Sequence, residues 1–254
     1  MIAKKDSQMR LQGKVSIITG AGRGIGHATV KKFLAEGAIV VAGDIDSSLL
    51  DAVNVEFKSG GRNGVAYLVD VTDAAAVAKM IESVITQYGQ IDVLVNNAGI
   101  VRDARMINMS EELFDDVINV NLKGTFNCAK AVFPHMMERQ TGVVLNASSI
   151  VGIYGNFGQT NYAASKFGVI GMAKTWAREF GRFGIRSNAV CPGMINTEIL
   201  KDIPETVLNN IISNIPMGRL GGASEIANTY AFLASDEASY INGAVIEVDG
   251  GATL

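Results

Sequence analysis

Seven short runs of mostly apolar residues recur along the chain, and most of them are apolar on both alternating faces. They span residues 15–19, 38–42, 64–69, 91–95, 142–147, 185–190 and 244–248. Stretches with helical periodicity lie between them, at about 25–36, 47–59, 73–88, 110–138, 161–181 and 224–234. Apolar strands that alternate with helices are typical of a parallel sheet covered on both faces. The pattern predicts an α/β fold: a single-domain, Rossmann-like, doubly wound parallel sheet of about seven strands with helices on both faces.

Domain boundaries follow from where this pattern begins and weakens. Residues 1–10 are polar and precede the first strand run, so we expect a flexible N-terminal lead-in followed by one domain over 11–254. The pattern weakens between Pro192 and Leu220, beyond the end of a predicted strand. Insertions at such places commonly act as lids, and we expect a lid at 194–216. A pair of surface helices is the alternative.

Composition narrows the class of protein. The net charge is −3 and like charges do not run together beyond Lys4-Lys5, which argues against nucleic acid and anionic membrane surfaces as partners. The sequence has no run of about eighteen apolar residues that could cross a bilayer, and the N-terminus has no apolar signal core. Cys128 and Cys191 are far apart with apolar neighbours, which predicts buried free thiols in a reducing compartment. We therefore expect a cytoplasmic protein.

The glycines after the first strand run are spaced for a dinucleotide. In the segment 19–26, Gly20 permits a tight turn, Gly24 lets the backbone approach a pyrophosphate, and Gly26 allows the following helix to pack closely on the sheet. The pyrophosphate would then lie on the N-terminus of that helix. A strand before the turn and a helix after it favour this interpretation over a glycine-rich loop without function.

Asp44, just past the second strand, points to the choice of dinucleotide. A carboxylate there can accept both hydroxyls of the adenosine ribose, and it would repel a 2′-phosphate. Asp46 and Ser47 are better placed to cap the next helix, so the ribose role is preferred for Asp44. Arg23 could approach a 2′-phosphate, but Asp44 is nearer the expected ribose position. The sequence predicts NAD(H) in preference to NADP(H).

Tyr162 and Lys166 are four residues apart, which places them on one face of a helix. A free tyrosine titrates near ~10, and a neighbouring cation favours the phenolate. Lowering that pKa by about three units takes roughly 4 kcal/mol of differential stabilisation. A lysine and a cationic nicotinamide could supply it, and the tyrosine would then transfer protons. His27 and His135 have no ligand spacing, so no metal is expected.

Several motifs in one order carry a resemblance. They are Thr19-Gly20-x-x-x-Gly24-Ile25-Gly26, Asn96-Asn97-Ala98-Gly99, Ser149, Tyr162-x-x-x-Lys166 and Pro192-Gly193. From Leu11 onward the chain resembles the short-chain dehydrogenase/reductase family. The resemblance implies an enzyme that interconverts a ketone and a secondary alcohol by direct hydride transfer, with a tyrosine as proton donor or acceptor.

The resemblance also implies roles for particular positions. Tyr162 would exchange the proton, Ser149 rather than Ser148 would bind the substrate oxygen, Lys166 would hold the nicotinamide ribose and lower the tyrosine pKa, and Asn121 would hold a water in a relay to Lys166. The residues implied in cofactor binding are Gly20, Arg23, Gly24, Ile25, Gly26, Asp44, Asp70, Val71, Asn97, Ala98, Gly99, Tyr162, Lys166, Pro192, Gly193, Ile195 and Thr197.

A finer resemblance concerns the substrate. Residues 97–103, 152–162, 218–227 and 232–241 are similar to bacterial 3-oxoacyl-acyl-carrier-protein reductases, a group that reduces 3-oxoacyl thioesters, usually with NADPH and as tetramers. This implies a homotetramer and an acyl-carrier-protein or coenzyme A thioester as substrate. Arg139 and Arg182 form only a thin basic patch for an acidic carrier, so electrostatic docking would be weak. Ile153, Phe157 and Met194 are the candidate pocket wall.

Two alternatives stay open. NAD is usually kept oxidised in cells, so the chain could instead be a catabolic NAD-dependent secondary-alcohol or hydroxyacyl dehydrogenase without a carrier protein. More remotely, it could be a non-catalytic NAD-binding protein, which the presence of Asn121, Ser149, Tyr162 and Lys166 disfavours. The sequence does not choose the physiological substrate, the reaction direction or the stereochemistry.

Overall fold

A seven-stranded parallel sheet forms the centre of the computed structural model, which describes residues 9–59, 63–198 and 205–252. The strand order is β3-β2-β1-β4-β5-β6-β9, and every neighbouring pair is parallel. The strands are β1 (Val15–Thr19), β2 (Ile39–Asp44), β3 (Gly64–Leu68), β4 (Val93–Asn96), β5 (Gly142–Ala147), β6 (Ile185–Pro192) and β9 (Val245–Val248). The predicted α/β fold and its seven strands are confirmed.

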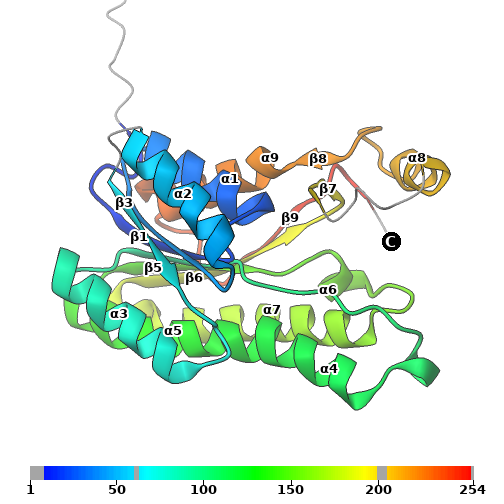
Figure 1. The fold of residues 1–254 in the computed structure, drawn as a ribbon, viewed down its shortest axis with the longest axis horizontal. Coiled ribbons are helices and arrows are strands. Elements are labelled where there is room, and N and C mark those ends of the chain that lie inside the picture. Colours follow the sequence, from blue (N-terminus) through cyan, green and yellow to red (C-terminus); the bar gives the residue numbers. More distant parts are fainter. Residues whose placement is uncertain (1–8, 60–62, 199–204, 253–254) are drawn as a thin grey trace, which may run out of the picture.

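Helices cover both faces of this sheet (Figure 1). One layer holds α1 (Gly24–Ala35), α2 (Ser47–Ser59) and α9 (Ala223–Ala234). The other holds α3 (Ala74–Tyr88), α4 (Glu111–Val117), α5 (Gly124–Arg139) and α7 (Thr160–Phe180). Two separate apolar cores result, one around Phe33 and Tyr230 and one around Ile81 and Trp176. Strands of the sheet contribute to both cores, which explains why their sequence runs are apolar throughout.

Local signals account for several helix boundaries. Asp73 caps α3, accepting hydrogen bonds from the backbone N–H groups of Ala75 and Ala76, and Gly89 ends it in the left-handed conformation with φ 74°. The predicted helix 110–138 is real but not uniform, because a π-helical turn (Ile118–Lys123) joins α4 to α5. Such turns occur frequently at functional sites, and this one carries Asn121.

The predicted lid is partly described. Its two ends lie side by side, because β7 (Ile195–Asn196) pairs with β8 (Gly221–Gly222), and α8 (Glu205–Ser213) lies between them in the chain. Ile215 is buried against Ile150 and Ala252 and anchors the far end of the segment. Residues 199–204 of the predicted lid lie outside the described residues.

The predicted N-terminal lead-in is described only at its end. Residues 1–8 lie outside the described part of the chain, but Arg10 makes a 2.7 Å ion pair with Glu36 at the end of α1. Arg10 therefore belongs to the folded domain. Cys128 and Cys191 are buried free thiols, as predicted. Among the described helices, none combines the length and apolar character needed to cross a bilayer.

Candidate active site

The predicted site residues gather at the carboxyl edge of the sheet. The glycine turn follows β1, Asp44 ends β2, Asn97 follows β4 and Ser149 follows β5. β1 and β4 are neighbours in the sheet although the chain passes through β2 and β3 between them. Ligands of open α/β sheets bind at such a point, where the strand order reverses.

The glycine turn has the geometry that a pyrophosphate needs. Gly20 and Gly24 adopt φ 62° and φ 55°, which side chains rarely tolerate. Arg23 precedes α1 in an extended conformation, and no side chain caps the helix. The first N–H groups of α1 are thus free of side-chain partners and favour an anion. The turn therefore fits the pyrophosphate of a dinucleotide.

Gly26 is the most constrained position of the turn. An added Cβ would collide with the Gly20 carbonyl oxygen and lie 2.7 Å from Asn97 Nδ2. We expect Gly26→Ala to destabilise the fold by about 1–3 kcal/mol, because the turn must move to accept the methyl group. NADH binding, followed by fluorescence, should weaken with the melting temperature. Gly171→Ala in α7, where a Cβ meets nothing within 4 Å, is the control and should neither weaken NADH binding nor lower the melting temperature, since alanine favours a helix interior over glycine; equal behaviour of the two variants would contradict this explanation.

Asp44 and Asp46 divide two tasks between them. Asp46 Oδ1 accepts hydrogen bonds from the Ser48 and Leu49 N–H groups at 2.9 and 3.3 Å, so Asp46 caps α2 as expected. Asp44 Oδ2 accepts from Gly22 N–H at 2.8 Å, which fastens the carboxylate to the glycine turn. A Cβ on Gly22 would lie 2.6 Å from Leu49 Cβ, so this glycine is sterically required. The motif spacing had not singled out Gly22.

Arg23 lies close enough to Asp46 to act on its carboxylate. The side chain of Arg23 is exposed, and its positive charge contributes to lowering the pKa of Asp46. The pKa of Asp46 lies below its usual value, first because Ser48 Oγ donates to it and in part because of Arg23. The carboxylate of Asp46 therefore offsets part of the positive charge of Arg23, which makes the local charge less favourable for a 2′-phosphate.

The remaining predicted cofactor residues lie along the same edge. Asn97 Nδ2 donates to the carbonyls of Thr19 and Gly20 at 3.0 and 3.1 Å, tying the end of β4 to the glycine turn. Asp70 accepts from Thr72 after β3, and Val71 is buried. Across the turn, the Thr197 methyl group lies 3.7 Å from a Cβ built on Gly24. The segment that includes Ile195 and Thr197 therefore borders the pyrophosphate turn.

Ser149, Tyr162 and Lys166 come together from β5 and α7. The Ser149 hydroxyl lies close enough to the Tyr162 hydroxyl to favour its phenolate, and Lys166 Nζ lies 5.6 Å from the centre of the tyrosine ring. Lys166 is buried and donates to the Ala147 carbonyl at 2.8 Å. Ser148 Oγ instead donates to the backbone carbonyl of Lys166, at 2.8 Å, and so fixes the helix. The geometry pairs Ser149, and not Ser148, with the tyrosine.

The expected lowering of the Tyr162 pKa is wrong for the protein alone. Burial raises the pKa of Tyr162 to about 12, and the hydrogen bond from Ser149 opposes this only in part. Burial also lowers the pKa of Lys166 to about 8. Removal of both groups from water outweighs the attraction between an ammonium and a phenolate. At neutral pH the phenol thus holds its proton and is equipped to donate it.

Asn121 lies beside this group, on the π-helical turn. Its Oδ1 accepts from Ile100 N–H at 2.8 Å, and its Nδ2 donates to the Ile100 carbonyl and to Ser165 Oγ. A Cβ on Gly99 would lie 3.3 Å from Asn121 Oδ1 and 3.4 Å from Lys166 Nζ. Glycine at position 99 thus keeps a side chain out of the space between the amide and the amine, as a relay through a small molecule requires.

The three candidate pocket residues have different surroundings. Ile153 packs on the small core that contains Ile170 and Cys191, and Met194 packs on the core that anchors the lid. Phe157 is 76% exposed, with the Arg105 guanidinium 5.2 Å from its ring. Phe157 therefore lies at the protein surface, and its place in a substrate pocket stays a prediction. Pro192 is the last residue of β6, and Gly193 follows it. A Cβ on Gly193 would lie 2.7 Å from Asp249.

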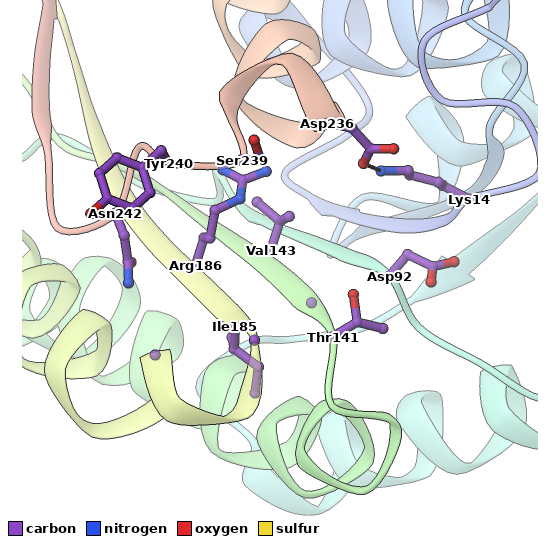
Figure 2. A pocket seen from close by; sticks show the side chains of 13 residues that line it. Lys14, Asp92, Thr141, Val143, Ile185, Arg186, Asp236, Ser239, Tyr240 and Asn242 are labelled. Atoms are coloured by element: carbon purple, nitrogen blue, oxygen red, sulfur yellow. Dashed lines mark hydrogen bonds and ion pairs between the residues drawn. The ribbon is translucent and has the colours of Figure 1, made fainter.

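A cavity of about 750 Å³ lies elsewhere, at the amino edge of the sheet (Figure 2). Figure 2 shows Lys14 and Asp236 joined across it, at 2.7 Å. Arg186 donates to the Ser235 carbonyl at 3.1 Å, and Asp92 pairs with Arg139 at 2.9 Å. The carboxylates at this cavity are already paired with cations. The cavity lies at the amino edge of the sheet and the glycine turn at the carboxyl edge, so this cavity is not the predicted site.

Comparisons with known proteins agree along nearly the whole chain. A family model described as Enoyl-(Acyl carrier protein) reductase matches residues 20–253. The chain is 52% identical over 246 residues to the 3-oxoacyl-(acyl-carrier-protein) reductase FabG of Thermotoga maritima, covering 97% of this chain and 100% of that one. It is 42% identical to the Escherichia coli protein of the same name, over 96% and 98% of the two chains. The crystal structure of gox2181 has a TM-score of 0.93 at 33% identity, over 96% and 97%.

Proposed function

The chain belongs to the short-chain dehydrogenase/reductase family of nicotinamide-dependent oxidoreductases, and we propose that it reduces 3-oxoacyl thioesters to 3-hydroxyacyl thioesters with NADH. The observation that carries the reaction type is the cluster of Ser149 and Tyr162 beside buried Lys166. The substrate class is supported by the names of the relatives, which act on carrier-protein thioesters. The whole described chain from Arg10 serves as one catalytic domain.

The chemistry divides between cofactor and protein. A bound nicotinamide cofactor supplies the hydride. Ser149 and Tyr162 provide two hydroxyl donors for the oxygen on which charge develops. Tyr162 gives its proton to that oxygen, and the raised pKa of Tyr162, about 12, keeps the proton available below alkaline pH. Lys166, with Asn121 behind it, is placed to replace that proton.

The preference for NADH is supported by Asp44. Its carboxylate is fixed to Gly22 at the end of β2, where the ribose next to adenine is expected. Its second oxygen accepts only from Asp46 N–H, at 3.1 Å, and has a lone pair left for a ribose hydroxyl. A 2′-phosphate would meet this carboxylate and be repelled by it. The choice of NADH rests on these contacts.

The acyl carrier is a further part of the proposal. Arg139, expected to help dock an acidic carrier protein, is paired with Asp92 and Gln90, and Arg182 lies 4.7 Å from the ring of Phe183. The basic patch is therefore thinner than the sequence suggested. We propose that the enzyme accepts the acyl chain on coenzyme A as well as on carrier protein, since less of the recognition depends on the carrier's acidic surface.

A substrate panel tests this function. NADH absorbance should fall with acetoacetyl thioesters of coenzyme A and of carrier protein, and much less with simple ketones, cyclic ketones and sugars. Activity on neither thioester would remove the proposed substrate class. Turnover confined to NAD⁺ with a secondary alcohol would identify the catabolic dehydrogenase, which the same carboxylate at Asp44 also favours.

Self-association completes the proposal. Phe126 on α5 is 44% exposed and Phe167 on α7 is 65% exposed, and such large apolar side chains are suited to a symmetric interface. We propose a homotetramer, which light scattering of the purified protein would test.

A further inference from the structure

Two loops far apart in the sequence meet at the N-terminal end of the helix that carries Tyr162. Residues 100–105 follow β4, and residues 155–159 lie between α6 (Val151–Tyr154) and α7. Ala104 and Gln159 form an isolated parallel bridge, and Ala104 N–H donates to the Gly158 carbonyl at 2.9 Å. Gln159 is the residue before α7, and Tyr162 lies in the first turn of that helix.

One side-chain contact closes this junction. Gln159 Nε2 donates to both oxygens of Asp103, at 3.0 and 3.1 Å. Gln159 Oε1 accepts from Asn156 Nδ2 at 2.8 Å, so the amide is oriented from its own loop. The side chain does not cap α7. Its amide nitrogen donates to the other loop, which a merely local structural role would not require.

Asn161, next to the tyrosine, repeats the connection. Its Nδ2 donates to the Arg102 carbonyl and to the Leu113 carbonyl, both at 2.9 Å, and its Oδ1 accepts from Tyr162 N–H at 2.8 Å. Asn161 is fully buried. The backbone of Tyr162 is thus held through one residue to the same loop that Asp103 anchors.

We propose that Asp103 and Gln159 are positioning residues that lock these two loops together, hold Tyr162 at the substrate entrance and keep a negative charge at the start of its helix. This inference rests on the proposed function, since it assigns the entrance of that same site. We call Asp103, Ala104, Gly158 and Gln159 the entrance latch. None of these four residues had been singled out for a role by the motif spacing alone.

The charge of Asp103 shifts the pKa of Tyr162 in a definite direction, which its hydrogen bond with Gln159 alone would not do. Asp103 contributes to raising the pKa of Tyr162, after burial, because a carboxylate disfavours a nearby phenolate. The other titratable groups that face Tyr162 are Lys166 on its own helix, Cys191 on β6 and Tyr230 on α9. Asp103 is exposed, so its influence is screened and modest.

Two variants separate the lock from the charge. Gln159→Ala removes the side-chain contact and keeps the carboxylate, and Asp103→Asn keeps an acceptor for Gln159 and removes the charge. We expect Gln159→Ala to raise KM for acetoacetyl-coenzyme A roughly three- to tenfold with little change in kcat, in line with one lost charge-assisted hydrogen bond at a partly exposed site. Amide exchange of Ala104 in the protein without substrate should become faster.

The pH profile reports the charge. Reduction needs the proton of Tyr162 and its resupply by Lys166, whose pKa is about 8, so activity is present below these pKa values and is lost as the pH rises through them. Without the carboxylate the phenolate is less disfavoured and the pKa falls, so Asp103→Asn should move the alkaline limb of kcat/KM to lower pH. Gln159→Ala should leave that limb in place. Asp51→Asn and Gln87→Ala, exposed positions on α2 and α3, should match the unmodified protein in every assay.

The outcomes are distinguishable from failure of the proposed function. If the unmodified protein turns over no 3-oxoacyl thioester, the proposed function fails, and the amide exchange of Ala104, which needs no substrate, still decides whether the latch exists. An unchanged KM and unchanged exchange in Gln159→Ala would overturn the lock. A pH profile of Asp103→Asn identical to that of the unmodified protein would overturn the role of the charge.

Discussion

Replacing Tyr162 by phenylalanine should lower kcat about 10²- to 10⁴-fold, the range that a positioned general acid contributes. Tyr162 supplies the titratable hydroxyl beside Ser149 in the described site, and its pKa of about 12 keeps it protonated under assay conditions. Phenylalanine fills the same volume, so the fold and the glycine turn should not change. Turnover of acetoacetyl-coenzyme A and NADH binding by fluorescence, measured side by side, check this.

A matched control distinguishes chemistry from packing. Tyr154→Phe removes a hydroxyl that donates to Glu247 at 2.8 Å, also near the end of the sheet, but not one that meets Ser149. It should retain most of the activity. Turnover by Tyr162→Phe close to that of the unmodified enzyme would show that the proton comes from another group.

Replacing Asp44 by serine should change the preference between NADH and NADPH by roughly 100-fold or more. Loss of hydrogen bonds from ribose to a carboxylate costs about 1.5–3 kcal/mol, which is roughly 10- to 150-fold in kcat/KM with NADH. Use of NADPH should rise at the same time, because the repulsion between the carboxylate and a 2′-phosphate is removed. The ratio of the two specificity constants with one ketone substrate measures both effects.

Asp46→Asn is the control for this exchange. It removes a carboxylate only two residues away, and asparagine still caps α2. Its effect on the ratio should be much smaller, since Asp46 accepts from Ser48 and Leu49 and not from the glycine turn. Equal use of NADPH and NADH by the unmodified enzyme would show that the role of Asp44 had been misread.

The strands could be predicted from the sequence because helices cover both faces of the parallel sheet, so its strands are apolar nearly throughout. β1 and β5 have the predicted bounds, and the others differ at their ends by up to two residues. The π-helical turn at 118–123 could not be predicted, since the apolar periodicity continues across it. The catalytic group could be located because Tyr162 and Lys166 share a helix face, which fixes their separation without knowledge of the fold.

Contacts between distant segments could not be predicted in the same way. The hydrogen bond from Gly22 to Asp44 and those from Gln159 to Asp103 depend on how β-strand ends meet, not on spacing within one element. The pKa of Tyr162 depends on burial, which the pair Tyr162 and Lys166 does not reveal. The partner of Arg139, Asp92, could not be predicted for the same reason, because it is 47 residues away.

Transfer of an isotope tests the central claim most directly. The enzyme is given acetoacetyl-coenzyme A and NADH that carries deuterium at the transferable position of the nicotinamide, and the product is analysed by mass spectrometry. Direct hydride transfer predicts one deuterium on the carbinol carbon of the 3-hydroxyacyl product and none on its hydroxyl oxygen after exchange with water. Product without carbon-bound deuterium, or no reduced product at all, would contradict the account.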